Sequence, residues 1–563
     1  MGVNDDWTYI WSADVLARTG HIAYSGWGAM PLGWQLYLGA LLIKLFGYTF
    51  TAPRLGVFAV SLCTAGLMQR VLVRCGATEQ NACFGALTVA LSPLFLPLSF
   101  TFMSDIPALF CLLVCMYGCV RALESPTARG AIGWLVFAAA SNVALGTVRQ
   151  IAWLGVLVMV PATAWCMRRR RGLLAAGAAS WLIGAAAIFA FLRWFRAQPY
   201  TFGEPLKPKH SAAAQYDIHC LFTTLLWATP VFLAFLVRFP FRRRWKWAVT
   251  AGAVVVVYLL ATRLTQAPRE WLFPFSLDEV SLQGIDIPNE LLGLRPEVIH
   301  PAAAYPLTVL SMSAWLACVY FVTGGRRAEV SDSRAGRSLS TTELFWLVGP
   351  FSAAYLLLII TRESIWDRYW IPLLFVLVLV LLRMYQGRVG LRLPVLSYAV
   401  LVLVAAFSVM GTHDLFATLR ARLGAAEALE AAGIPRGSMY AGIEFDGWTQ
   451  LLLNGHVNNP RVKNPPNSYR RYLDPPSTKC RPWWESWVPD IHADYELSYQ
   501  PLSCVGSTQY GPFPYRTWLA PRLREIYVLG KPPGLITISS SPGAAATMPE
   551  TSPEQGHTPV PNR

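Results

Sequence analysis

Long apolar stretches alternate with short polar loops over the first 411 residues of this 563-residue chain. A helix that crosses a bilayer needs about 17–25 mostly apolar residues, and about twelve stretches approach this length. The pattern predicts a mainly α-helical, polytopic transmembrane bundle. The predicted spans run near residues 50–68, 80–102, 105–120, 131–148, 150–167, 173–192, 218–237, 247–264, 302–323, 343–360, 370–383 and 393–411.

Amphipathic and polar segments flank these spans. Residues 31–47 are apolar on one side and too short to cross a membrane, which predicts a helix lying at its surface. Residues 412–538 predict a small extracytoplasmic α/β domain, with an amphipathic helix over 417–432 and a strand over 438–448. The tail 539–563 is rich in Pro, Ser, Thr and Gly and is predicted to be disordered.

Composition supports the membrane assignment. Apolar residues make up 54% of the chain and charged residues 14%, with a mean hydropathy of +0.39, whereas soluble domains carry about 25% charge. The net charge of +15 fits either a nucleic-acid protein or basic loops on the cytoplasmic side of a membrane. Six alternate loops hold 20 basic residues and the loops between them hold ten, which favours the membrane and excludes a nucleic-acid partner.

The same loop asymmetry predicts the orientation in the plasma (inner) membrane. Residues 1–49 form a first extracytoplasmic loop with surface helices, followed by the transmembrane domain 50–411 and by extracytoplasmic loops near 196–217 and 265–301. A polar extracytoplasmic segment with no span before it predicts that a first transmembrane helix is missing from the sequence. Translocation of a short N-terminus is the alternative.

Cysteine usage adds one prediction. Nine of the 11 cysteines lie in or beside apolar runs and are expected to be buried. Cys111, Cys115 and Cys119 share one helix face without His, Asp or Glu, which indicates packing rather than metal binding. Cys480 and Cys504 stand in the polar C-terminal segment, where a disulfide between them is possible outside the cytoplasm.

Three aspartates are the strongest candidates for chemistry. Asp105 lies between two apolar stretches, where a carboxylate at the membrane edge costs up to a few kcal/mol and is by default functional. The alternative is a helix N-cap before Pro107. Asp5 and Asp6 open the first polar segment, and without further context they are also explained as solvated N-caps.

Short motifs around these aspartates change that balance. The first motif consists of Asp5, Tyr9 and Ala13 at four-residue spacing. Further short motifs follow along the chain at residues 19–20, 30–34, 44–47, 52–54, 104–108, 148–150 and 367–372. Their order and spacing resemble the C-type (GT-C) glycosyltransferases of the protein O-mannosyltransferase and aminoarabinose-transferase kind. The chain departs from that pattern in its missing first helix and in Ala-Met-Pro at 29–31, where the aminoarabinose branch has Lys-Pro-Pro.

The resemblance implies a reaction and its residues. The donor is a polyprenyl-phosphate-linked sugar, and the acceptor is a hydroxyl of a lipid, glycan or protein. Asp5 matches the catalytic base that takes the hydroxyl proton, while Asp6 and Asp105 orient the acceptor or the base, or hold a divalent cation, Mg or Mn. Direct displacement inverts the anomeric centre. The expected substrate-binding residues for the lipid phosphate are Arg54, Arg149, Arg362, Arg368 and Tyr369.

Two other functions compete with glycosyl transfer. A polytopic transporter or lipid flippase of the cell envelope usually has ionisable residues at the bilayer midplane, often within internal repeats. Here the notable acids fall at the outer edge of the predicted spans, and no clear repeat is present. A non-catalytic scaffold for envelope assembly has no need for the Asp5 and Asp105 pair.

Overall fold

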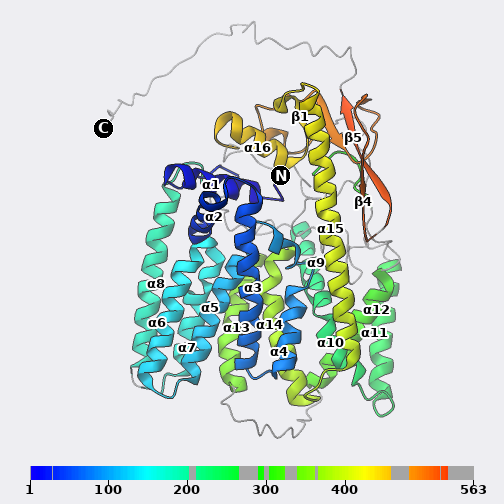
Figure 1. Cartoon of the computed structure of the whole chain (residues 1–563). Helices are drawn as coiled ribbons and strands as arrows, with labels where there is room; N and C mark the ends of the chain where they lie inside the picture. Colours follow the sequence, from blue (N-terminus) through cyan, green and yellow to red (C-terminus); the bar gives the residue numbers. More distant parts are fainter. Residues whose placement is uncertain are drawn as a thin grey trace, which may run out of the picture.

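An upright bundle of helices carries a small mixed domain at one end (Figure 1). The computed structural model describes residues 2–27, 30–170, 172–201, 211–264, 290–296, 304–323, 339–361, 366–457, 481–519 and 521–530. The predicted tail 539–563 and Cys480 lie outside these ranges. Cys504 is disulfide-bonded, and the other nine described cysteines carry free thiols.

The prediction of a polytopic helical protein is confirmed, with fewer full-length spans than expected. Among the described residues, eight helices are long and apolar enough to cross a membrane. They are α3 (Thr51–Arg74), α5 (Asp105–Glu124), α6 (Ala128–Leu145), α8 (Leu173–Arg196), α12 (Ala304–Thr323), α13 (Thr341–Ile360), α14 (Ile371–Arg388) and α15 (Val395–Ala431).

Three of the four remaining predicted spans are short or broken helices, and the fourth, over 247–264, is a helix of 20 residues. The pair α9 (Ser211–Trp227) and α10 (Thr229–Val237) bends by 60° and counts as a ninth span if taken together. The others are α4 (Glu79–Ala90), α7 (Val160–Cys166) and α11 (Trp245–Leu264). The prediction of one continuous span over 80–102 is wrong, because Pro93 and Pro97 follow directly after α4 and a proline cannot continue the hydrogen-bond ladder.

Two helices form the centre of the bundle. In their apolar windows, 78% of α5 and 72% of the segment Asp367–Arg388, which contains α14, are buried, against 22–39% for the other six candidate spans. Large apolar side chains on the outer helices are exposed, as expected of a surface that contacts lipid. The N-terminal ends of α5 and of the α14 segment carry Asp105 and Arg368, so these two residues stand on the most rigidly packed part of the fold.

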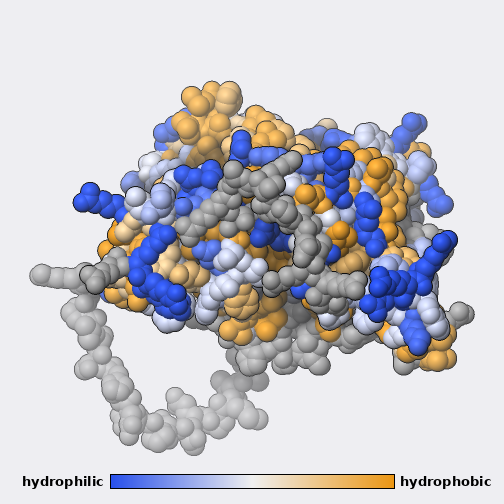
Figure 2. Space-filling model, turned by 90° about the horizontal axis from the view of Figure 1, so that it is seen from below, coloured by the Kyte–Doolittle hydropathy of each residue, from blue (hydrophilic) through white to orange (hydrophobic). Residues whose placement is uncertain are grey.

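Figure 2 shows hydrophilic side chains spread among apolar ones over the end of the bundle opposite the small domain. Exposed arginines on the loops there include Arg168, Arg243 and Arg392. Arg74 and Glu124 close the ends of α3 and α5 with an ion pair of 3.0 Å. The arginine-rich loops of the sequence therefore gather at one end and the small domain lies at the other, as the loop asymmetry predicts.

The helix α15 connects the bundle to the small domain and continues without a break at residue 412. Its sheet has the order β1-β2-β5-β3, with β4 also paired to β5; β1 and β2 are parallel and the other pairs are antiparallel. The strands are β1 (Met439–Tyr440), β2 (Tyr495–Ser498), β3 (Gly506–Ser507), β4 (Phe513–Arg516) and β5 (Leu523–Gly530).

The strand predicted over 438–448 is wrong beyond its first residues. Gly442 has a φ of 99°, a conformation that favours glycine, and it ends β1 and starts α16 (Ile443–Asn454). The Asp446 side chain accepts a hydrogen bond of 2.8 Å from the Ala441 backbone N–H. This bond closes the turn, so the acidic residues of the segment face the protein interior instead of alternating along a strand.

Two N-terminal helices, α1 (Asp6–Thr19) and α2 (Gly33–Phe46), lie at the end of the bundle that faces the small domain (Figure 1). The helix predicted over 31–47 is confirmed. Trp7 of α1 is fully buried in a cluster with Trp27, Trp484 and Trp487. A Cβ placed on Gly447 of α16 meets the Trp7 ring at 2.4 Å, so α16 approaches α1 as closely as a glycine permits.

This contact predicts the effect of a single methyl group. Gly447→Ala is expected to lower the free energy of unfolding by about 1–3 kcal/mol, because the Trp7 ring must move out of a packed cluster. Gly424→Ala in α15 is the matched control, since a Cβ there meets nothing within 4 Å. That control is expected to be neutral or stabilising by up to about 1 kcal/mol. Thermal unfolding in detergent measures both variants, and equal midpoints contradict the packing argument.

Candidate active site

Four segments bring charged residues together at the end of the bundle that faces the small domain. Asp5 immediately precedes α1, and Asp105 is the first residue of α5. Arg149 lies between the short helices η2 (Gly146–Val148) and η3 (Gln150–Trp153), and Arg368 lies in η8 (Asp367–Trp370) ahead of α14. The sequence separations among the four residues are large, so only the fold places them in one site.

The Arg368 guanidinium lies between the two carboxylates. Its Nη2 is 3.6 Å from Asp5 Oδ2, and its Nε is 3.6 Å from Asp105 Oδ2. These separations are ion-pair distances, longer than a hydrogen bond. Arg149 forms a close ion pair with Asp105 through Nη1 and Oδ1. Two carboxylates and two guanidinium groups thus form one mutually neutralising cluster.

Asp5 is the most accessible member of this cluster. Its side chain is 24% exposed, whereas the side chains of Asp105 and Arg368 are each 4% exposed. The Trp27 indole N–H donates a hydrogen bond of 2.7 Å to Asp5 Oδ1. Asp5 stands at the N-cap position of α1 but makes no side-chain capping bond, so the N-cap explanation does not account for its orientation.

Burial raises the pKa of Asp5 above its usual value, and the Arg368 charge and the Trp27 hydrogen bond act in the opposite direction. The nearby Asp105 carboxylate raises the pKa of Asp5 further. Tyr9, one turn along α1, is fully buried, and desolvation raises the pKa of its phenol far above the ordinary value. Tyr9 is therefore neutral at any physiological pH, while Asp5 can exchange a proton.

Tyr369 supports both arginines from one side. The Arg149 guanidinium carbon lies 4.3 Å from the centre of the Tyr369 ring, and that of Arg368 lies 5.5 Å from it. A cation over an aromatic face is stabilised by the ring quadrupole. The Tyr355 hydroxyl donates a hydrogen bond of 2.9 Å to the Tyr369 carbonyl and fixes the backbone at this point.

Asp6 and Arg54, two of the predicted site residues, pair with each other in the structure. Asp6 is fully buried, and Arg54 pairs with both of its oxygens at 2.8 and 3.1 Å. The backbone N–H groups of Val3 and Phe102 donate to the same carboxylate. A carboxylate with four donors and no exposure is unsuited to proton transfer with a substrate. Asp6 and Arg54 join α1 to α3 and to the turn before α5, and their predicted roles toward the substrate stay predictions.

A divalent cation needs several carboxylate or other oxygen ligands. Within the described residues, no group of three or more His, Cys, Asp or Glu side chains could hold a metal ion. Asp6 is occupied by Arg54, and Asp105 is paired with Arg149. Guanidinium groups therefore engage the carboxylates of Asp6 and Asp105 here, and a divalent cation at this site stays a prediction.

Three residues important for this site were not predicted. Trp27 donates to Asp5, and nothing in the sequence distinguishes it from the other 21 tryptophans. Glu444 and Arg422 form a buried ion pair of 2.7 Å, and their only sequence signal is charge within otherwise apolar segments. Arg362, a predicted phosphate ligand, lies outside the described residues.

The buried ion pair connects the small domain to the site. Arg422 of α15 also pairs with Glu290 at 2.9 Å, and all three side chains are at most 1% exposed. The Asn4 backbone N–H donates a hydrogen bond of 3.1 Å to Glu444. Asn4 has a φ of 51°, which asparagine tolerates better than most residues. The residue before Asp5 is thus fixed by the small domain.

Comparison with known proteins gives a loose likeness in structure. ArnT from Cupriavidus metallidurans bound to undecaprenyl phosphate aligns over 76% of this chain and 68% of its own, with a TM-score of 0.39 and 12% identity. ArnT in the apo state aligns over 74% and 71%, with a TM-score of 0.35 and 16% identity. The archaeal oligosaccharyltransferase AglB from Archaeoglobus fulgidus, in complex with an inhibitory peptide and a dolichol-phosphate, aligns over 87% and 60%, with a TM-score of 0.33 and 13% identity.

No protein-family profile and no curated protein sequence matches the chain. Because the alignments are loose, with TM-scores below 0.5, the function proposed for this chain rests on its own side chains.

The Asp6–Arg54 pair makes a testable prediction about stability. Arg54→Gln leaves a fully buried carboxylate without its counter-ion and is expected to cost about 3–5 kcal/mol. Arg18→Gln is the control, because the Arg18 side chain is 66% exposed in its 2.7 Å pair with Asp14 and such pairs contribute about 0.5 kcal/mol. Thermal unfolding in detergent separates the two. A control that unfolds as early as Arg54→Gln contradicts the anchoring role of the Asp6 pair.

Proposed function

We propose that this chain is a membrane glycosyltransferase that moves a sugar from a polyprenyl-phosphate donor to a hydroxyl acceptor on the extracytoplasmic side, with inversion. The observation that carries this proposal is the position of Arg368 within 3.6 Å of both Asp5 and Asp105. A partly exposed carboxylate beside two buried guanidinium groups supplies a base and an anion site within one cluster. The acceptor is a hydroxyl of a lipid, glycan or protein.

Asp5 acts as the general base in this proposal. A sugar or serine hydroxyl is a weak nucleophile at neutral pH, and a positioned carboxylate that takes its proton accelerates attack by about 10²–10⁴-fold. Burial raises the pKa of Asp5, which makes its carboxylate a stronger base than a solvated aspartate. The hydroxyl proton moves to Asp5 as the oxygen bonds to the anomeric carbon.

Arg149 and Arg368 stabilise the negative charge that develops on the leaving phosphate. The bond between the anomeric carbon and the phosphate oxygen breaks, and its electron pair remains on the lipid-linked phosphate. Guanidinium groups match phosphate oxygens with two parallel N–H donors. Both arginines are already oriented by Asp105 and Tyr369, so little reorganisation accompanies charge development.

The location follows from the distribution of charge along the bundle. Arginine-rich loops mark the cytoplasmic end of multi-pass proteins, and here they lie opposite the small domain. We therefore infer that the Asp5 cluster and the small domain are extracytoplasmic, in the plasma membrane. A transporter or lipid flippase remains the second candidate. Its transport would leave no glycosylated product, so an assay of sugar transfer distinguishes the two.

The first prediction concerns the base itself. Asp5→Asn is expected to lower the rate of sugar transfer from a synthetic polyprenyl-phosphate sugar by about 10²–10⁴-fold, because the amide cannot accept the hydroxyl proton. Asp14→Asn on the same helix removes an equal charge from a pair with Arg18 and is expected to retain full activity. Product formation in reconstituted vesicles is the measurement. Unchanged turnover in Asp5→Asn excludes Asp5 as the base.

The second prediction concerns pH. As the pH falls through the raised pKa of Asp5, its carboxylate becomes protonated and can no longer act as a base. The rate of sugar transfer is therefore expected to decline at low pH. Trp27 stabilises the charged form of Asp5 and thereby lowers its pKa. Trp27→Phe removes this donor and is expected to shift the acid limb of kcat/KM toward higher pH. An unshifted or oppositely shifted limb contradicts the assignment.

A further inference from the structure

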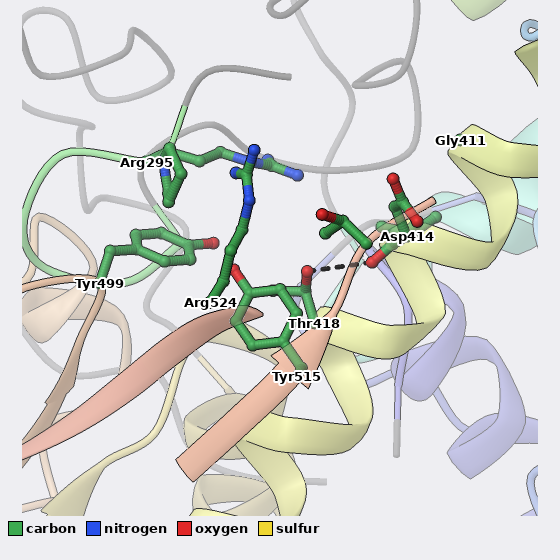
Figure 3. A pocket seen from close by; sticks show the side chains of 10 residues that line it. Arg295, Gly411, Asp414, Thr418, Tyr499, Tyr515 and Arg524 are labelled. Carbon is green, nitrogen blue, oxygen red and sulfur yellow. Dashed lines mark hydrogen bonds between the residues drawn. The ribbon is translucent and has the colours of Figure 1, made fainter. Parts of the chain in front are cut away.

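A polar pocket lies between α15 and the hairpin of β4 and β5, apart from the Asp5 cluster (Figure 3). Arg295 and Arg524 line it from two separate segments, and Figure 3 shows their guanidinium groups directed into the same space. Tyr515 lies within electrostatic range of both. None of these residues belongs to the Asp5 cluster, and no step of the proposed reaction uses them.

Two acidic residues at or near this pocket, Asp414 and Glu290, have partners among the described residues. The Asp414 carboxylate accepts backbone N–H groups from Trp518 at 2.6 Å and Leu519 at 3.0 Å, and His413 Nδ1 lies 3.0 Å from it. Glu290 accepts the Tyr499 hydroxyl at 2.8 Å and pairs with Arg422. A guanidinium has five N–H donors, so Arg295 and Arg524 can bind a ligand in addition to protein groups.

The pocket lies at the level where α15 leaves the membrane. The last large apolar residue exposed on α15 is Val409. Leu415 packs in the core of the bundle, and Ala417 packs in the core of the small domain. Asp414 and the pocket therefore lie at the boundary between lipid and water, which is the level of the phospholipid headgroups.

The exposed side chain of Trp518 is a second indication that the pocket lies at headgroup depth. Its ring is 53% exposed and stacks on His413 with a centroid separation of 3.8 Å. Tryptophan is enriched where its apolar ring meets the headgroup region. An exposed tryptophan beside a pocket with two arginines combines an interfacial anchor with a site for a negative group.

We propose that this pocket binds the phosphate of an anionic phospholipid in the leaflet on the side of the small domain, with Arg295 and Arg524 as its ligands and Trp518 at headgroup depth. Guanidinium groups bind phosphate oxygens through paired N–H donors. A choline headgroup would bring a second cation toward two arginines, so an anionic headgroup is the better fit. The inference is independent of the proposed glycosyl transfer.

The test measures protection of the full chain by lipid. The purified protein in neutral detergent is titrated with phosphatidylglycerol, with phosphatidylcholine and with inorganic phosphate, and the unfolding temperature is recorded. Phosphatidylglycerol is expected to raise it most, since a ligand that binds only the folded state stabilises it. The double variant Arg295→Gln/Arg524→Gln is expected to weaken the apparent affinity about tenfold or more.

Arg522→Gln is the matched control, because Arg522 is exposed on the same hairpin and does not line the pocket. It is expected to keep the wild-type response to phosphatidylglycerol. Equal protection by phosphatidylcholine, or by inorganic phosphate alone, overturns the proposal, as does a double variant that binds as well as the control. If the double variant does not fold, native mass spectrometry of the wild-type protein decides: preferential retention of phosphatidylglycerol over phosphatidylcholine supports the site, and equal retention overturns it.

Discussion

The buried guanidinium of Arg368 constrains the site more than any other group. It is 3% exposed, and a charge so far from water is tolerated only where opposite charges compensate it. Asp5 and Asp105 supply that compensation from α1 and α5. Both helices start at this point, and α14 starts just after Arg368, so positive helix ends also favour negative groups here. Displacing α5 would leave the buried Arg149 without the Asp105 carboxylate.

Two adjacent aspartates serve different purposes because their surroundings differ. Asp6 has no exposed surface and four hydrogen-bond donors, whereas the side chain of Asp5 is 24% exposed, with one indole donor and an ion pair at 3.6 Å. A buried carboxylate whose oxygens accept several hydrogen bonds holds its neighbouring segments together. A carboxylate with fewer donors and some exposure can still exchange a proton. The rigid pair of Asp6 and Arg54 thereby fixes the backbone from which Asp5 reaches the cluster.

The hydrophobic pattern is sufficient to predict most of the helices. The acidic residues at the predicted membrane edge, with the motifs around them, also single out Asp5, Asp105, Arg149 and Arg368, which the structure brings into one cluster. The hydrophobic pattern alone does not show where a helix breaks, because 80–102 is mostly apolar on both sides of the prolines that follow α4. Nor can it report which arginine meets which aspartate. Arg54 and Arg368 have similar sequence settings beside apolar spans, yet one pairs with Asp6 and the other with Asp5, a choice made by tertiary packing.

Asp5 is held from both directions along the chain. On one side Asp6 is bound to the bundle through Arg54, and on the other the Asn4 amide is bound to Glu444 of the small domain. A rotation of that domain therefore moves Asn4, and with it Asp5, relative to Asp105 on α5. Misplacement by about 1 Å can cost 10²-fold in rate. The contact between Trp7 and Gly447, which sets how closely the domain docks, therefore helps to position Asp5.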